Sequence, residues 1–370
     1  MRKHSVHRLV PAATAALALC MVGAGAASAQ AAPRERVVGH VYEATNAAAG
    51  NAVQVFDRTA DGRLTPAALV PTGHPGLGAS LASQNAVVRD GDLLYVVNGG
   101  DDTVTTLAIT RRGLVVRDTE SSGGDRPVSV TVRRGLVYVL NQTDATISGL
   151  TVDRSGDLTP VPGSTRALST DGATPPTATA AAQVSFSPDG RSLVVTHKGD
   201  RAIDTFAVRG STVGTAVRNE SSGVTPYGFD FDRRGNVIVS EAGSGAVSSY
   251  ALRGDRLGVI SASVPDTQAA ACWLVVSRDG RTAWTVNAAS STISSYRIAG
   301  DGSLSLLEAV AARTTGGGTD VALAPDGGSL HVRLADGSVS SWDVARDGGL
   351  TFLGTARGAA TSGTAGLAAD

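Results

Sequence analysis

The chain has 370 residues, and its 32 Lys and Arg against 33 Asp and Glu leave a formal net charge of −1. No basic cluster after residue 30 could follow a phosphate backbone, so we expect no nucleic-acid partner. No apolar run after residue 30 has the length of a bilayer, so we also expect no membrane span.

The N-terminal segment, residues 1–29, has the features of a secretory signal peptide. A basic start is followed by an apolar run at residues 9–22 and by the small residues Ala27-Ser28-Ala29, which suit signal peptidase. We therefore expect an exported, extracellular protein whose single domain spans residues 30–370. A lipid anchor on Cys20 is the less favoured alternative, because Leu19 stands where a small residue is required.

Removal of residues 1–29 would leave Cys272 as the one cysteine, so no intramolecular disulfide is expected. A lone thiol could act as a nucleophile. The small and apolar neighbours of Cys272 favour an inert packing role instead.

The remaining chain repeats one unit of four short segments rich in β-branched and aromatic residues. Examples are "VSFSPDG" for the first segment, "LVVTH" for the second and "AIDTFAV" for the third. The last residue of the second segment recurs at spacings of 43, 56, 44 and 46 residues, at Asn98, Asn141, His197, Glu241 and Asn287. The insert at residues 169–181 explains the one long spacing. A period in the forties with four strands per unit predicts a β-propeller.

Seven units can be counted, starting near Val37, Ser83, Arg126, Ala181, Pro226, Ala270 and Gly317. The first unit lacks its first segment, whereas the chain ends in "GTAGLAAD", which resembles "GTDVALAP" at residues 318–325. The sequence thus predicts an all-β, seven-bladed propeller with four antiparallel strands per blade, closed by a C-terminal strand that completes blade 1.

The candidate site lies where the first strand of each blade begins and the second strand ends, because both points are at the same end of the channel. His197 and Glu241 end the second strands of adjacent units, and we expect them to act as base and acid. The competing interpretation is that residues at this position simply form turns, which suits Asn98, Asn141 and Asn287 well.

Further side chains at the same rim are predicted to bind substrate. They are Gln183 and Gln84, placed at equivalent positions of their first strands, together with Tyr227, Trp273 and Asn287. No cofactor is otherwise expected. The oxygens of Glu241, Asn287 and Asn141 would suit Ca²⁺, which leaves a calcium-dependent site as a weaker possibility.

Three segments, "SFSPDGRSLVVTHKGDRAIDTF", "TPYGFDFDRRGNVIVSEAGSGAVSSY" and "DGRTAWTVNAASSTISSYRIAGDGSL", resemble the β-propeller lactonase family, which includes 6-phosphogluconolactonase-like and carboxymuconate-cyclase-like proteins. "LASQ", "SEA" and "CW" resemble exported, actinobacterial-type members. The resemblance covers nearly the whole chain after residue 30 and implies a lactonase-type activity. At the positions of the family's His and Arg-His motifs, this chain has Ala182 and Tyr227-Gly228, whereas Gln183 and Glu241 are retained.

We therefore expect a secreted, monomeric lactonase-like propeller that hydrolyses or isomerises a small cyclic ester at the channel mouth, with water as nucleophile. The alternative is a non-catalytic extracellular binding propeller that has lost the family's catalytic His and Arg, since one fold hosts many functions.

Overall fold

The computed structural model describes residues 1–2, 36–171, 179–360 and 366–370. Residues Arg36–Asp370 form one compact unit. The predicted signal peptide falls almost entirely outside the described residues, as does the middle of the predicted insert. In the described part of the chain, no helix is long and apolar enough to cross a membrane.

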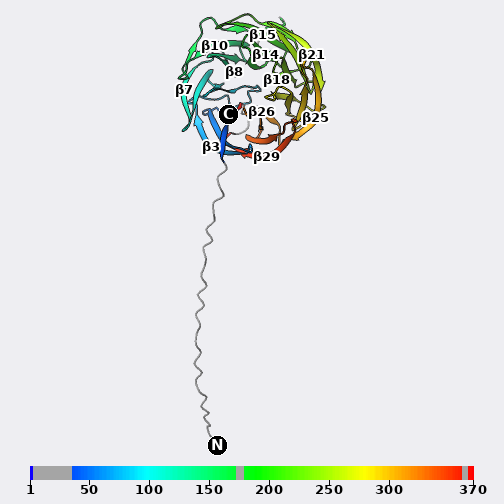
Figure 1. Ribbon diagram of the computed structural model, residues 1–370. Helices are drawn as coiled ribbons and strands as arrows, with labels where there is room; N and C mark the ends of the chain where they lie inside the picture. The colour runs from blue at the N-terminus through cyan, green and yellow to red at the C-terminus, as the bar shows by residue number, and fades with distance from the viewer. Residues whose placement is uncertain (3–35, 172–178, 361–365) are drawn as a thin grey trace. The chain divides into compact units, whose positions relative to one another are not determined.

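The compact unit is a ring of seven antiparallel sheets, which confirms the predicted all-β seven-bladed propeller (Figure 1). Blade 1 contains β1 (Val37–Ala44), β2 (Ala52–Thr59), β3 (Leu64–Pro71) and the final strand β30 (Leu367–Ala369). Blade 2 contains β4 (Val87–Asp90), β5 (Leu93–Asn98), β6 (Thr103–Thr110) and β7 (Gly113–Ser121). Blade 3 contains β8 (Pro127–Arg133), β9 (Leu136–Asn141), β10 (Thr146–Val152), β11 (Leu158–Pro160) and β12 (Arg166–Ala167).

Blade 4 contains β13 (Ala181–Phe186), β14 (Ser192–His197), β15 (Ala202–Arg209), β16 (Thr212–Val213) and β17 (Val217–Glu220). Blade 5 contains β18 (Pro226–Phe231), β19 (Val237–Glu241), β20 (Ala246–Arg253) and β21 (Arg256–Pro265). Blade 6 contains β22 (Ala271–Val276), β23 (Thr282–Asn287), β24 (Thr292–Ile298) and β25 (Leu304–Arg313). Blade 7 contains β26 (Gly318–Leu323), β27 (Ser329–Leu334), β28 (Ser338–Val344) and β29 (Leu350–Arg357).

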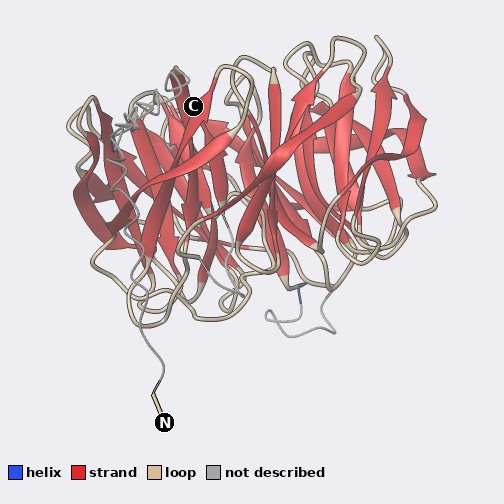
Figure 2. Cartoon of the chain, turned by 90° about the horizontal axis from the view of Figure 1, so that it is seen from below, coloured by secondary structure: helices blue, strands red, loops and turns tan. Residues whose placement is uncertain are grey.

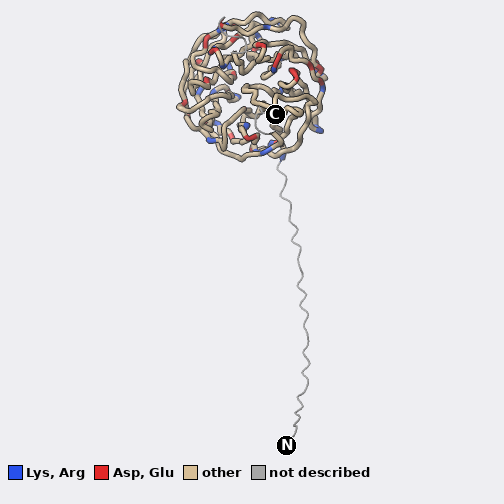
Figure 3. Tube along the Cα trace, turned by 180° about the vertical axis from the view of Figure 1, so that it is seen from behind, with Lys and Arg blue, Asp and Glu red and all other residues tan. Residues whose placement is uncertain are grey.

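Each sheet runs from an innermost strand A, beside the channel, through B and C to an outermost strand D. The outermost strand is broken in two in blades 3 and 4, where β11 and β12 both pair with β10, and β16 and β17 both pair with β15. The strands run between two rims of turns (Figure 2). We call them the A–B rim, which carries the A–B and C–D turns, and the B–C rim, which carries the B–C turns and the loops entering each blade. Basic and acidic residues are both spread around the ring (Figure 3).

The core lies between the blades and is fullest near the channel. Every residue of β9 and of β14 is buried, whereas β7 on the outside of blade 2 has no buried residue. All seven C strands contribute one large side chain that is no more than 1% exposed: Phe56, Leu107, Leu150, Phe206, Tyr250, Tyr296 and Trp342. Burying a side chain of this size contributes about 1.5–3 kcal/mol, so the repeated position stabilises every blade.

The C-terminal strand closes the ring as the sequence predicts. β30 pairs antiparallel with β1, with Glu43 opposite Leu367. The amide of Gly366 also donates a hydrogen bond to Oδ2 of Asp320 in blade 7, at 2.9 Å. The tail is thereby bonded to both neighbours, and blade 1 gains the innermost strand that its own segment lacks.

Candidate functional site

The strand register places the ends of the B strands at equivalent positions of the B–C rim. His197, Glu241 and Asn287 each pair with the first residue of the A strand of their own blade. In blade 7 this place belongs to Leu334, which faces Gly318, while Arg333 lies one residue earlier. Equivalence in the ring does not bring these side chains together, because each one points into its own blade.

His197 is fully buried between two carboxylates of blade 4. Its Nδ1 is 3.2 Å from Oδ1 of Asp200, and its Nε2 is 3.2 Å from Oδ2 of Asp204. Burial alone would lower the pKa of His197, but the two carboxylates outweigh burial and raise it. Asp200 also accepts a hydrogen bond from Arg218 at 2.9 Å, and Asp204 accepts one from the amide of Ser169 at 2.7 Å. The imidazole therefore lies between two carboxylates that favour its protonated form, and this network fixes the B–C turn of blade 4.

Glu241 is fully buried in blade 5 and has different partners. Its Oε1 accepts hydrogen bonds from the hydroxyls of Ser221, at 2.7 Å, and Tyr250, at 3.3 Å. Its Oε2 is buried without a hydrogen bond in the described part of the chain. Burial raises the pKa of the carboxyl, although the surrounding donors act in the opposite direction. Glu241 is thus a shielded carboxyl that takes up a proton more readily than an exposed one.

The structure does not bring His197 and Glu241 into one pocket. Both have 0% exposure, and no hydrogen bond joins them within the described residues. Asn287 is equally enclosed, with its Nδ2 donating to the hydroxyls of Thr292 at 3.1 Å and Ser294 at 2.7 Å. These bonds within single blades agree with the turn-forming interpretation, and the acid–base roles stay a prediction.

The oxygens proposed for Ca²⁺ are likewise distributed over separate blades. Asn141 donates to the carbonyl of Ser122 and the hydroxyl of Ser148, both at 3.3 Å in blade 3, far along the ring from Glu241. Among the described residues, no group of three or more His, Cys, Asp or Glu side chains is placed to hold a metal ion.

Gln84 does not lie in the A strand of its blade, where the alignment of the repeat units placed it. It precedes that strand. β4 begins only at Val87, and positive φ angles of 48° at Ala82 and 67° at Asn85 turn the intervening segment inward. Gln84 then bonds to the backbone of Leu274 in blade 6, accepting from its N–H at 3.1 Å and donating to its carbonyl at 2.8 Å. Because blades 2 and 6 are not neighbours in the ring, residues 81–86 bridge the channel and plug it.

Trp273 and Gly228 hold this plug in place. The indole Nε1 of Trp273 donates to the carbonyl of Ser83 at 2.8 Å. A Cβ on Gly228 would lie 2.1 Å from Oε1 of Gln84 and 2.8 Å from the carbonyl oxygen of Cys272. The absence of a side chain at Gly228 therefore makes room for the crossing segment.

Gln183 bonds to backbone in the same way as Gln84, but it joins two neighbouring blades. Its Oε1 accepts from the amide of Phe229 at 2.8 Å, and its Nε2 donates to the carbonyl of Phe229 at 2.9 Å. The side-chain amide thus imitates one rung of a β-ladder between blades 4 and 5. Both predicted substrate-binding glutamines use the oxygen and the nitrogen of their side-chain amide to bond with backbone.

The chemically distinctive group at the channel mouth is Lys198, which sequence reasoning missed. Its amine donates to the carbonyl of Ala82 in the plug and lies 4.9 Å from the ring centroid of Tyr227. Burial lowers the pKa of Lys198 to about 8. A usable signal was present in composition, because Lys3 and Lys198 are the only lysines in a chain with 32 basic residues.

Aromatic and thiol groups surround this amine. Tyr227 and Trp273 meet edge to face with their ring centroids 5.1 Å apart, and each retains 6% exposure, so their edges reach the surface. The tyrosine hydroxyl forms no hydrogen bond with the described residues. Burial raises the pKa of the Cys272 thiol to about 12, although Lys198 opposes the effect. This thiol stays protonated near neutral pH, which agrees with a packing role.

Comparisons with known proteins agree with the fold. The family described as "Lactonase, 7-bladed beta-propeller" matches residues 48–170 and 163–265. The periplasmic gluconolactonase of Pseudomonas aeruginosa superposes with a TM-score of 0.71 at 17% identity, covering 89% of this chain and 98% of that one. A "putative 6-phosphogluconolactonase" of Bacteroides uniformis gives a TM-score of 0.70 at 18% identity, covering 90% and 99%.

A similar fold also occurs in a protein whose structure contains a bound protein segment. Chaetomium thermophilum Sqt1, whose structure contains the N-terminus of a ribosomal protein, gives a TM-score of 0.57 at 16% identity, covering 86% of this chain and 84% of that one. No curated protein sequence matches the chain. At these identities the structural likeness establishes the fold, and the site must be argued from its own residues.

Proposed function

The chain belongs to the lactonase family of seven-bladed β-propellers, and on that premise we propose that it hydrolyses a small lactone at the B–C rim, where Lys198, Tyr227 and Trp273 surround the plugged channel mouth. The observation that carries this proposal is the Lys198 amine, held against Tyr227 with its pKa lowered to about 8. At neutral pH such an amine exists in both protonation states, as a general base must.

The reaction needs one proton acceptor that later returns the proton. The neutral Lys198 amine takes a proton from water while the water oxygen forms a bond to the lactone carbonyl carbon. The ring C–O bond then breaks, and the Lys198 ammonium gives its proton to the departing alkoxide. The sum is addition of one water to one lactone, which yields one hydroxy acid.

The choice of lysine at this position supports that role. The chain uses arginine at all but two of its basic positions, and arginine cannot lose its proton in a protein. A basic residue needed only for charge or for a hydrogen bond to Ala82 could have been arginine. Tyr227 and Trp273 offer aromatic edges against which a small ring can pack, with the tyrosine hydroxyl available to bind its exocyclic oxygen.

The other predicted residues keep narrower roles. Gln84, Gln183 and Asn287 are engaged in holding the blades and the plug, so we propose that they shape the mouth rather than contact substrate. The acid and base roles predicted from the sequence for Glu241 and His197 are the competing assignment, which the same experiment tests beside Lys198. The basic, apolar and small-residue segments of positions 1–29 support export of the protein, where its substrate would be extracellular.

The test is a hydrolysis panel of γ- and δ-lactones with wild type, Lys198→Met, Lys198→Arg and Glu241→Gln, each with and without chelator. We expect loss of turnover in both Lys198 variants, and a wild-type kcat that rises with pH through about 8 after subtraction of the alkaline background. Full activity of Lys198→Arg would contradict the base assignment. Unchanged activity of Glu241→Gln would remove Glu241 from the chemistry, and loss of activity with chelator would restore the calcium hypothesis. No turnover of any lactone by wild type would favour the non-catalytic binding propeller.

A further inference from the structure

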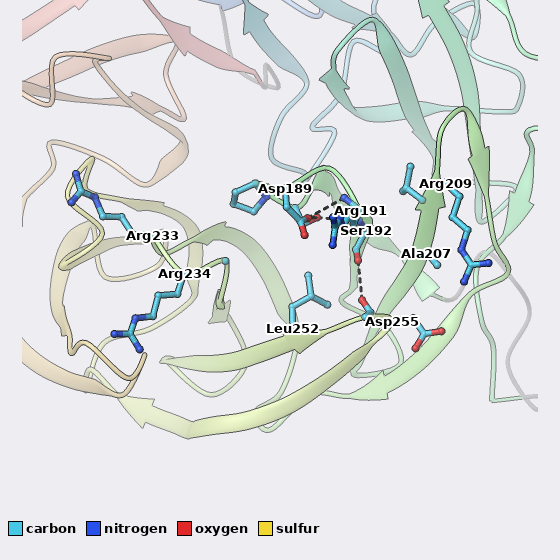
Figure 4. A pocket seen from close by; sticks show the side chains of 14 residues that line it. Asp189, Arg191, Ser192, Ala207, Arg209, Arg233, Arg234, Leu252 and Asp255 are labelled. Carbon is cyan, nitrogen blue, oxygen red and sulfur yellow. Dashed lines mark hydrogen bonds between the residues drawn. The ribbon is translucent and has the colours of Figure 1, made fainter.

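A wide groove lies on the opposite, A–B rim, between blades 4 and 5. Its volume is ≈ 800 Å³, within the range of small-molecule sites. The lining comes from the A–B turns of both blades, from the end of β15 in blade 4 and from the C–D turn of blade 5 (Figure 4). The floor is fixed where the Ser192 hydroxyl of blade 4 donates to the carbonyl of Gly254 in blade 5, at 2.9 Å.

The lining carries an excess of positive charge. Arg191, Arg209, Arg233 and Arg234 line it together with only two carboxylates, Asp189 and Asp255, which gives the lining an excess of two positive charges. Asp279 and Asp301 of blade 6 interact electrostatically with Arg233 and Arg234 from outside the lining. None of the four guanidinium groups forms an ion pair or hydrogen bond with the described residues. The Asp189 carboxylate is instead engaged within its own turn, accepting from the Ser187 hydroxyl at 2.7 Å.

The repeat supplies an internal comparison for this charge. The equivalent groove between blades 2 and 3, of ≈ 500 Å³, is lined by two arginines and two aspartates: Arg117, Arg154, Asp90 and Asp92. The equivalent groove between blades 6 and 7, of ≈ 430 Å³, is balanced in the same way by Arg278, Arg346, Asp279 and Asp326. The excess at blades 4 and 5 is therefore not a general property of the rim.

The excess of positive charge arises because the A–B turn of blade 5 differs in sequence from the A–B turn repeated in other blades. Three A–B turns read "SPDG", "SRDG" and "APDG", with an aspartate at the third position: Asp189, Asp279 and Asp326. In blade 5 the turn reads "DRRG", and Arg234 occupies that position. Asp232, at the first position, takes over the capping by accepting from the amides of Arg234 at 2.8 Å and Asn236 at 2.9 Å. The turn thus keeps its shape while its third side chain changes from anion to cation.

We propose that this groove binds an extended polyanion, a linear molecule with several phosphate or carboxylate groups along its length. Arg233 and Arg234 stand at one end of the groove and Arg209 at the other, with Arg191 between them (Figure 4). A chain of anions can contact the arginines at both ends of the groove at once. Guanidinium groups match phosphate and carboxylate oxygens in pairs, which provides orientation as well as charge.

The test is calorimetric titration of the full chain with tripolyphosphate, citrate and inorganic phosphate at low salt. We expect tripolyphosphate to bind at one site more tightly than inorganic phosphate, and added salt to weaken it. The double variant Arg233→Gln/Arg234→Gln should weaken binding about tenfold or more. Arg209→Gln, at the other end, should weaken it as well.

The matched control is Arg111→Gln/Arg112→Gln, which removes two consecutive exposed arginines from the C–D turn of blade 2 on the same rim. This control should leave the affinity within about twofold of wild type. Tighter binding of citrate than of tripolyphosphate would identify the ligand as a polycarboxylate, and the reverse as a polyphosphate. Equal weakening by the control, or no binding of any probe, would overturn the proposal. Lactone turnover takes no part in this readout.

Discussion

Replacing Lys198 with Met should make the protein more stable while removing its proposed base. The pKa of Lys198 falls from 10.5 to about 8, and each pH unit of that difference corresponds to about 1.4 kcal/mol. Holding the charged amine at the channel mouth therefore costs about 3 kcal/mol near neutral pH. Loss of the hydrogen bond to the carbonyl of Ala82 offsets about 1 kcal/mol of the gain. Ala82 is only partly buried, so water can replace that bond.

The expected net gain is about 2 kcal/mol in the free energy of unfolding at pH 7, measured by urea denaturation. The gain should depend on pH in a defined direction. Because the folded pKa is the lower one, the unfolded chain binds more protons between pH 8 and pH 10.5. The stability of wild type therefore rises through that window, and its difference from Lys198→Met shrinks.

A suitable control is Arg313→Met, which removes an exposed charge at the end of β25 and should change stability by less than about 0.5 kcal/mol. The reasoning would be refuted if Lys198→Met were no more stable than wild type at pH 7, or if the difference did not narrow at high pH. Either result would show that the amine is not held at an energetic cost, and the proposed base would lose its physical basis.

Three further predictions concern the plug, the turn network and the tail. Gly228→Ala should destabilise the fold by about 1–3 kcal/mol in urea denaturation, because the new Cβ would displace Gln84. The control Gly258→Ala should not, because no atom lies nearer than 4.0 Å to the Cβ it would add. Because the pKa of His197 is raised in the folded protein, wild type has a stabilising contribution that is fully present below pH 6.5 and is lost as pH rises through that pKa. His197→Asn should remove this pH dependence of the free energy of unfolding, measured by denaturation at several pH values; the same dependence in the variant would show that the network carries no charge. Burial raises the pKa of Asp320 to about 7, so wild type loses stability as pH rises from 3.8 to 7. Asp320→Asn still accepts the hydrogen bond from Gly366 and should remove that loss, as measured by thermal unfolding; an equal loss in the variant would contradict the prediction.

The ring was accessible to sequence analysis because its signals are local. Turn residues, strand alternation and the period all lie within one unit of about 45 residues, and the tail repeats the motif of residues 318–325. Even the equivalence of His197, Glu241 and Asn287 was predicted correctly, since it follows from counting along the B strand.

The sequence pattern did not show into which blade each of these side chains points. Thr196 and His197 are adjacent, yet the hydroxyl of Thr196 donates to the carbonyl of Tyr227 in blade 5, while His197 turns to Asp204 in its own blade. Alternation along a strand shows that neighbours face apart, but it does not show which one faces a site.

The plug was hidden for a different reason. Gln84 and Leu274 are 190 residues apart and belong to no shared repeat position, so periodicity carries no information about their contact. The composition marks Lys198 as unusual, but its position between the plug and Tyr227 depends on contacts that no repeat position encodes.

The three residues of β30 also have a consequence for how the molecule matures. Blade 1 combines the earliest strands of the ring with the latest one, so its sheet stays unfinished until residues 366–370 have emerged from the ribosome. The amide of Asp370 then bonds to the carbonyl of His40, and Tyr42 donates to its carboxylate at 2.5 Å, which fastens the seam. Until that seam forms, blade 1 lacks its innermost strand and the first and last blades of the ring are not joined by β30.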